Sequence, residues 1–218
     1  MLSGPHHIPP GTTHLLVVLH GFGADGNDLM PLHTPLQAAL GQAGVILGLA
    51  CPHAPAAASM AEGGLSQGRQ WFSPAGWAFR DEPGLHSLVP QLNAYLQTLL
   101  ETHRLKPAHL TLMGFSQGSM ALLGALPWLN PQPARCISLS GGLTMPPKPE
   151  AMAAQAARPP ILFVHGLDDD VWPADHTVAA AQFYRQHGYP TQQELLANLG
   201  HGISAEVLAH ITLALTAS

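Results

Sequence analysis

Charged residues are scarce in this sequence. Asp, Glu, Lys and Arg make up only 10% of the 218 residues, whereas hydrophobic residues make up 46%. Disordered chains have the opposite balance, so this composition predicts a folded protein with a full hydrophobic core. The length fits one domain. We expect residues 1–218 to form that single domain, with residues 1–13 as a flexible or extended N-terminal segment.

Basic runs and long apolar runs are both missing. The eight Lys and Arg residues are spread along the chain, and the formal net charge is -5. Binding to nucleic acid depends on clustered cations that neutralise phosphates, so we expect no nucleic-acid partner. No apolar run approaches the ~20 residues that a membrane span needs, and the first residues do not resemble a signal peptide. We therefore expect a cytoplasmic protein without a membrane span.

Cysteine is nearly absent, with only Cys51 and Cys136. Secreted disulfide scaffolds carry more, so a reduced, intracellular protein is expected, although the sequence leaves open whether these two residues pair. Histidine is frequent, but the 14 histidines do not show the local spacings of metal ligands, and neither HExxH nor CxxC occurs. We expect no metal and no cofactor.

Short apolar runs alternate with segments of helical periodicity. Such runs are typical of strands buried on both faces of a parallel sheet. The expected strands are residues 15–19, 45–49, 110–113, 136–139, 161–165 and 193–196. The expected helices are residues 85–103, 117–129, 174–188 and 203–216. This order predicts an α/β fold with a mostly parallel central sheet, flanked by helices on both faces. Residues 50–84 and 141–160 interrupt the order, and we expect functional loops there.

One strand leads directly into a nucleophile motif. The expected strand 110–113 runs into Gly114-Phe115-Ser116-Gln117-Gly118, and a helical segment follows. This is the G-x-S-x-G pattern in the strand, turn and helix context that it requires. Such a turn holds the serine in a strained backbone with its hydroxyl clear of the sheet, and the glycines let neighbouring elements pass close by. The motif predicts Ser116 as a nucleophile.

A glycine-rich loop follows the first expected strand. Acyl transfer needs fixed N–H donors for the oxyanion, and we expect the backbone N–H groups of Phe22 and Gln117 to supply them. A phosphate-binding loop is the alternative, because residues 21–26 fit G-x-G-x-x-G. That motif needs an acidic residue about 20 positions further on, but residues 36–50 contain none, so we favour the oxyanion interpretation. His20 is given no chemical role.

A serine nucleophile needs a base and an acid that orients the base. In hydrolases with this motif the acid and then the histidine follow the serine along the chain. Asp168, Asp169 and Asp170 follow the expected strand 161–165, and the residues alone leave the choice among them open. His201 lies between two glycines before the last helical segment, which predicts it as the base.

Together these segments resemble the phospholipase/carboxylesterase family of the α/β-hydrolase fold, which includes acyl-protein thioesterases. The similarity extends from about residue 14 to the C-terminus, and its blocks are residues 19–29, 114–118, 165–173 and 200–204. It implies Ser116 as nucleophile, His201 as base, and Phe22 and Gln117 as oxyanion donors. It also implies Asp169 as the acid, because the family's acid lies four residues after the histidine of its His-Gly block, here His165.

The resemblance departs from the family at the substrate loop. Residues 70–73 are similar to the family's Trp-Phe-Asp element, but Ser73 replaces the acidic residue. We expect Trp71 and Trp172 to line an apolar substrate pocket, with core packing as the alternative for these two and for Phe72, Trp77 and Phe79.

The expected activity is hydrolysis of carboxylic esters or thioesters through an acyl-enzyme on Ser116. The substrate would be a small-molecule or lipid ester or thioester. Acyl-protein thioesterase and lysophospholipase are alternatives for the natural activity, and a serine peptidase or a non-catalytic binding protein are weaker ones. The sequence leaves open whether the chain forms a homodimer.

Overall fold

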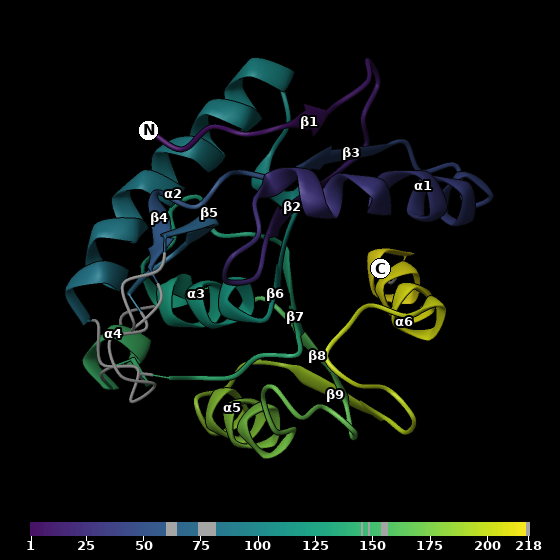
Figure 1. Ribbon diagram of the computed structural model, residues 1–218. Coiled ribbons are helices and arrows are strands. Elements are labelled where there is room, and N and C mark those ends of the chain that lie inside the picture. Colours follow the sequence, from purple (N-terminus) through teal and green to yellow (C-terminus); the bar gives the residue numbers. More distant parts are fainter. Residues whose placement is uncertain (60–64, 74–81, 145, 148, 154–156, 217–218) are drawn as a thin grey trace.

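The computed structural model describes residues 1–59, 65–73, 82–144, 146–147, 149–153 and 157–216. Figure 1 shows a central sheet with helices on its two faces. The strands of this sheet are β1 (His6–His7), β2 (His14–Leu19), β3 (Leu47–Ala50), β6 (Leu110–Phe115), β7 (Arg135–Leu139), β8 (Ile161–Gly166) and β9 (Thr191–Leu196). The α-helices are α1 (His33–Gly41), α2 (Glu82–His103), α3 (Gln117–Ala125), α4 (Pro149–Ala153), α5 (Asp175–Gln186) and α6 (Ala205–Thr216).

The central sheet has the strand order β1-β3-β2-β6-β7-β8-β9. Only β1 runs antiparallel to its neighbour, and the other neighbouring pairs are parallel. This arrangement confirms the predicted fold class. Because parallel strands end at the same edge, the residues that follow β2, β6 and β8 meet at the carboxyl edge of the sheet, where ligands bind in folds of this kind.

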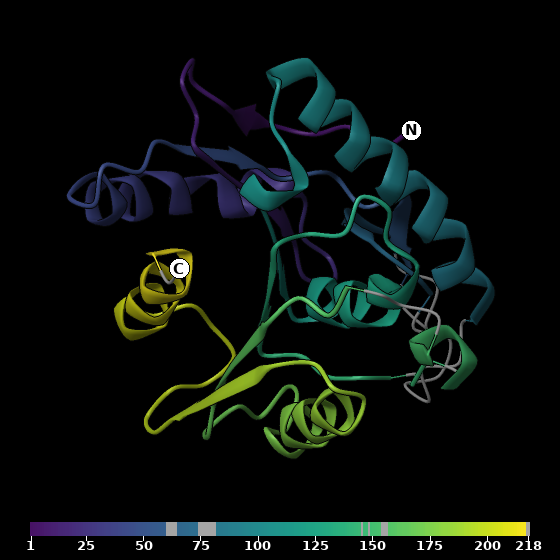
Figure 2. The same cartoon turned by 180° about the vertical axis from the view of Figure 1, so that it is seen from behind.

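Side chains of the strands alternate between two hydrophobic layers. In β2, Leu15, Val17 and Leu19 belong to the layer shared with α2, α3 and α5, whereas Leu16 and Val18 belong to the layer shared with α1 and α6. Figures 1 and 2 show these two groups of helices on opposite sides of the sheet. Both faces are covered, which explains why the strands read as continuous apolar runs in the sequence.

Several segments differ from the sequence-based expectation. Helix α1 is not predicted, because it is short and buries only two residues, Leu36 and Leu40. Residues 50–84, expected as a loop, contain the hairpin of β4 (Ala56–Ser59) and β5 (Leu65–Gln70). These alanines and polar residues have little strand propensity, so their pairing with each other decides the structure. Residues 141–160 contain the five-residue helix α4.

Residues 1–13, expected as a flexible or extended segment, run extended and pack against the sheet. The strand β1 pairs with β3, the Cys51 N–H donates to Pro5 O at 3.0 Å, and Leu2 is buried. Cys51 and Cys136 are free thiols in the core, so no disulfide joins them. Burial raises the pKa of the Cys51 thiol to about 12. Among the described residues, no helix is long and apolar enough to cross a membrane. The cytoplasmic location stays a prediction.

We expect His14, at the start of β2, to make the fold less stable in acid. Burial, with a smaller effect of Arg135, lowers the pKa of His14 to about 4. An unfolded histidine has a pKa of about 6.5, so below that pH the unfolded state binds the extra proton. The free energy of unfolding therefore falls as the pH drops from about 6.5 to about 4.

The variant His14→Gln cannot ionise, and its amide can still bond the Thr111 hydroxyl that His14 Nε2 contacts at 2.9 Å. Between pH 6.5 and pH 4, its free energy of unfolding should therefore fall by up to about 3 kcal/mol less than that of the parent protein. Urea unfolding of both proteins between pH 7 and pH 4 measures the difference. If the two proteins lose the same free energy over this range, His14 does not carry the effect.

Candidate active site

Strand β6 passes into α3 through a single strained residue, Ser116. Its backbone angles, φ 54° and ψ -119°, lie in a region that residues with a side chain rarely adopt. A Cβ at Gly114 would lie 2.4 Å from the backbone of Gly118, and a Cβ at Gly118 would lie 2.1 Å from the Leu19 carbonyl oxygen. Glycine at both positions therefore allows the strand and the helix to meet in this turn, at the carboxyl edge of the sheet.

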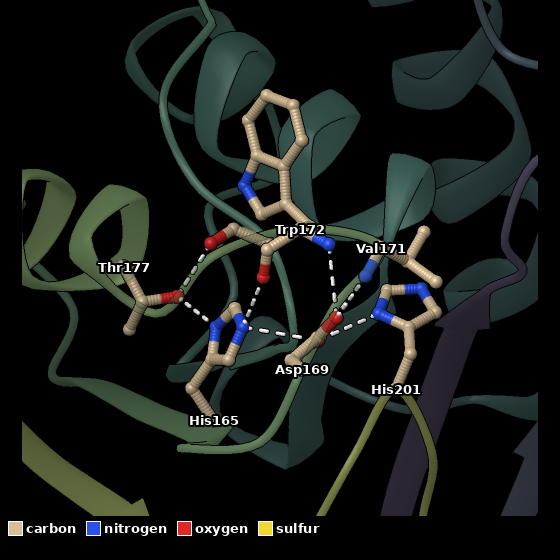
Figure 3. A network of polar contacts seen from close by, with 7 residues as sticks. His165, Asp169, Val171, Trp172, Thr177 and His201 are labelled. Atoms are coloured by element: carbon tan, nitrogen blue, oxygen red, sulfur yellow. Dashed lines mark hydrogen bonds and ion pairs between the residues drawn. The ribbon is translucent and has the colours of Figure 1, made fainter.

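A carboxylate and an imidazole meet at the same edge. Asp169 lies in the turn after β8, and His201 lies in the loop before α6; His201 Nδ1 is 2.7 Å from Asp169 Oδ2. The other carboxylate oxygen accepts the N–H groups of Val171 at 3.0 Å and Trp172 at 2.9 Å (Figure 3). When Nδ1 donates to the carboxylate, Nε2 is left with a free lone pair, as a general base requires.

Of the three neighbouring aspartates, the structure brings Asp169 to His201. Asp169 is 7% exposed, whereas Asp168 and Asp170 are exposed to solvent. Burial alone would raise the pKa of Asp169, but the hydrogen bonds from Trp172 and His201 outweigh it and hold the pKa below its ordinary value. The group is therefore an ionised carboxylate at neutral pH.

Ser116 and His201 line one pocket of about 500 Å³, together with Phe22. The ring of Phe115, the residue before the serine, contacts the His201 ring at 5.0 Å between centroids. Among the described residues, no hydrogen bond joins the Ser116 hydroxyl to the His201 imidazole. Such bonds are often long in free enzymes and shorten when substrate binds.

The loop after β2 uses several of its N–H groups in hydrogen bonds within the fold. The N–H groups of Gly23 and Ala24 donate to Arg69 O and Gly21 O, and that of Gly26 donates to His53 Nδ1. These groups cannot surround a phosphate at the same time, which contradicts the alternative of a phosphate-binding loop. In the described part of the chain the Phe22 N–H has no partner, and Phe22 lines the pocket.

His20 fixes the direction of that free N–H group. The Ala54 N–H donates to His20 Nε2 at 3.0 Å, so the ring hydrogen is on Nδ1, which lies 2.7 Å from Gly21 O. Burial lowers the pKa of His20, which agrees with this neutral form. In a trans peptide the next N–H points away from the carbonyl, so holding Gly21 O also orients the Phe22 N–H. Beyond the His-Gly dipeptide, no sequence signal points to this arrangement.

Gln117 is the first residue of α3, so its N–H has no acceptor within the helix and lies at the helix N-terminus beside Ser116. Its buried side chain has a separate structural use. The amide oxygen accepts the Trp71 N–H and the amide nitrogen donates to Phe72 O, both at 3.0 Å. The side chain therefore holds residues 71–72 against the nucleophile turn.

The two tryptophans expected at the substrate pocket are not among the residues that line it. Trp71 is 2% exposed, and its indole N–H donates to His20 O at 2.7 Å. The Trp172 ring stacks on His176 with 4.1 Å between centroids. Neither residue lines the pocket of Ser116, and their contact with substrate stays a prediction. Trp77 and Phe79 lie outside the described residues. No group of three metal-ligating side chains occurs in the described part of the chain.

Comparison with known proteins gives a consistent result. The family model for phospholipase/carboxylesterase matches residues 10–217. Among solved structures, the chain is similar to esterase PE8, with 30% identity, a TM-score of 0.83 and coverage of 98% of this chain and 97% of that one. It is also similar to SOBER1 of Arabidopsis thaliana, with 22% identity, a TM-score of 0.79 and coverage of 93% and 97%.

A further similar structure is acyl-protein thioesterase 2 of Zea mays, with 24% identity, a TM-score of 0.72 and coverage of 98% of each chain. At 22% and 24% identity, the similarity to SOBER1 and to the thioesterase concerns the fold. Taken together, the matches confirm the expected α/β-hydrolase fold.

We expect Gly118→Ala to destabilise the nucleophile turn, because the added methyl group would meet the backbone of β2. Overpacking of this kind costs about 1–3 kcal/mol of unfolding free energy. Gly41→Ala, near the exposed end of α1, is the control, since its nearest neighbour is a flexible glutamine side chain at 3.4 Å. Urea unfolding should show a loss only for Gly118→Ala. Equal stability of the two variants would contradict the prediction.

Proposed function

The chain belongs to the phospholipase/carboxylesterase family and is a serine hydrolase that acts on esters, and we propose that Ser116, His201 and Asp169 perform the hydrolysis. One observation carries the proposal: His201 bonds the buried Asp169 carboxylate at 2.7 Å and shares a pocket with Ser116. These three side chains come from segments far apart in the sequence. Their meeting at one edge of the sheet supports a joint role in catalysis.

The first half of the proposed reaction forms an acyl-enzyme. His201 Nε2 takes the proton of the Ser116 hydroxyl while the oxygen attacks the ester carbonyl carbon. The N–H groups of Phe22 and Gln117 donate to the oxyanion that develops. The bond to the leaving group then breaks, and the alcohol or thiol receives its proton from His201.

The second half repeats the same steps with water. His201 removes a proton from water, which attacks the acyl group on Ser116, and the carboxylic acid leaves as the serine hydroxyl is restored. Asp169 is ionised and held by two backbone N–H groups, so it can stabilise the His201 imidazolium in both halves without moving.

The pocket supports an apolar acyl group as the substrate part that binds beside Ser116. Leu29, Leu32, Phe115 and Ile203 form apolar walls, and Asp28 is a carboxylate in the lining. A volume of about 500 Å³ lies within the range of small-molecule sites. We propose neutral carboxylic esters with short or medium acyl chains as the substrate class, and thioesters of the same acids as an extension.

Replacing the nucleophile tests the reaction directly. We expect Ser116→Ala to lower kcat for p-nitrophenyl esters by about 10⁶-fold, because the three groups act as a unit. A fluorophosphonate probe should label the parent protein and not this variant. Ser87→Ala, on the exposed surface of α2, is the matched control and should keep both activity and labelling. A variant without Ser116 that keeps a tenth of the esterase rate would refute the assignment.

Narrowing the pocket tests the acyl site. We expect Leu32→Trp to lower kcat/KM for octanoate esters by about tenfold or more while changing acetate esters little, since only the longer chain needs the apolar wall. Val178→Trp adds the same side chain at an exposed position of α5 and serves as the control. A panel of p-nitrophenyl esters graded by chain length gives the readout, and equal losses for all esters would count against an acyl site here.

A further inference from the structure

A second histidine contacts the Asp169 carboxylate from the side opposite to His201. His165 is the fifth residue of β8, and its side chain is fully buried. Its Nε2 lies 3.1 Å from Asp169 Oδ2 and 2.7 Å from Trp172 O. Its Nδ1 lies 2.6 Å from the Thr177 hydroxyl on α5. Figure 3 shows His165 and His201 approaching the carboxylate from two sides.

The neighbours of His165 decide which ring nitrogen donates. A carbonyl oxygen and an ionised carboxylate surround Nε2, and neither can donate, so Nε2 carries a hydrogen. In this neutral ring Nδ1 carries no hydrogen, so it accepts from the Thr177 hydroxyl, which also contacts Gly141 O. The ring is therefore fixed at both ends, with Nε2–H directed at Asp169 and Trp172.

We propose that His165 is a positioning residue that fixes Asp169 Oδ2 in line with His201. The inference rests on the proposed role of Asp169 as the acid. A carboxylate oxygen can accept more than one hydrogen bond, and a bond from His165 restricts where the next donor can lie. Two backbone N–H groups hold Oδ1. Both oxygens of the carboxylate are therefore fixed by groups other than His201.

The hydrogen bonds form a continuous chain across four elements. Gly141 follows β7, Thr177 lies on α5, His165 on β8 and His201 before α6, and Asp169 joins the last two. Burying an imidazole costs more free energy than burying an apolar side chain, because its two polar nitrogens need hydrogen-bond partners. Partners outside the triad orient the acid in the way that outer groups orient metal ligands.

Few ionisable groups act on this pair. Burial lowers the pKa of His165, and the Trp172 carbonyl and the Asp169 carboxylate oppose that effect. The charged or titratable neighbours are Asp169 in the turn after β8 and His201 before α6. On α5, His176 stacks on the Trp172 ring. When the His165 donor is removed, Oδ2 is left to His201 alone and holds its imidazolium more strongly.

The variants His165→Asn and His165→Gln distinguish a positioning role of His165 from a packing role. The amide nitrogen of glutamine reaches the place of a histidine Nε2, whereas that of asparagine reaches only the place of Nδ1. We expect His165→Asn to lower kcat by about 10–100-fold with KM changed less than about threefold. The acid limb of its kcat/KM profile should move to higher pH by about half a unit. His165→Gln should restore most of kcat and return the profile toward that of the parent.

Further variants keep the test decisive. If His165→Asn does not fold, Thr177→Val removes the bond that orients the ring and should shift kcat and the profile in the same direction by a smaller amount. The control is His176→Asn, which replaces an exposed histidine next to Thr177 and should leave kcat and the pH profile unchanged. Rates are divided by the number of sites that a fluorophosphonate titrates, so partial unfolding does not count as lost catalysis.

The outcomes distinguish this inference from the proposed function. If Ser116→Ala abolishes activity but His165→Asn and Thr177→Val keep the parent kcat and pH profile, only the role of His165 is overturned. If His165→Gln is as impaired as His165→Asn, the imidazole serves packing and the inference also fails. If Ser116→Ala keeps its activity, the proposed function itself falls.

Discussion

A buried carboxylate must have its charge balanced and its oxygens hydrogen-bonded, and the arrangement at the carboxyl edge of the sheet follows from that requirement at Asp169. Four donors satisfy it: two backbone N–H groups of its own turn and two imidazoles. An unpaired carboxylate at this depth would be protonated instead, because desolvation opposes its charge. The same bonds that stabilise the charge also fix the orientation of the group, so stability and chemistry depend on one set of contacts.

The parallel sheet brings the other groups to this place. Strands β2, β6 and β8 end at one edge, with β7 between the last two, so the loop with Phe22, the turn with Ser116 and the turn with Asp169 all lie at that edge. His201 follows β9, which pairs with β8, and therefore arrives beside Asp169. Strain at Ser116 is tolerated because the sheet and α3 fix both ends of the turn, and because glycines on either side leave room for the backbone.

Hydrogen bonds between distant residues then set the details. The Ala54 N–H fixes the ring of His20, which fixes the Gly21 carbonyl and so the free N–H of Phe22. Gln117 holds Trp71 and Phe72 through its side chain while its own N–H remains at the helix start. The buried position of Trp71 follows from this pairing, which explains why an aromatic residue in a loop-like sequence packs beside the pocket and does not line it.

The sequence by itself determined what depends on local pattern. Apolar runs predicted the parallel strands, and G-x-S-x-G between a strand and a helix predicted the turn at Ser116, because strand burial and glycine spacing are properties of neighbouring residues. Choosing Asp169 among three aspartates required the resemblance to a family. Only the tertiary structure decided the β4–β5 hairpin, the ring directions of His20 and His165, and the burial of Trp71. Two of these features depend on distant partners, 34 residues apart for His20 and Ala54 and 46 for Trp71 and Gln117, and no local pattern records such pairs.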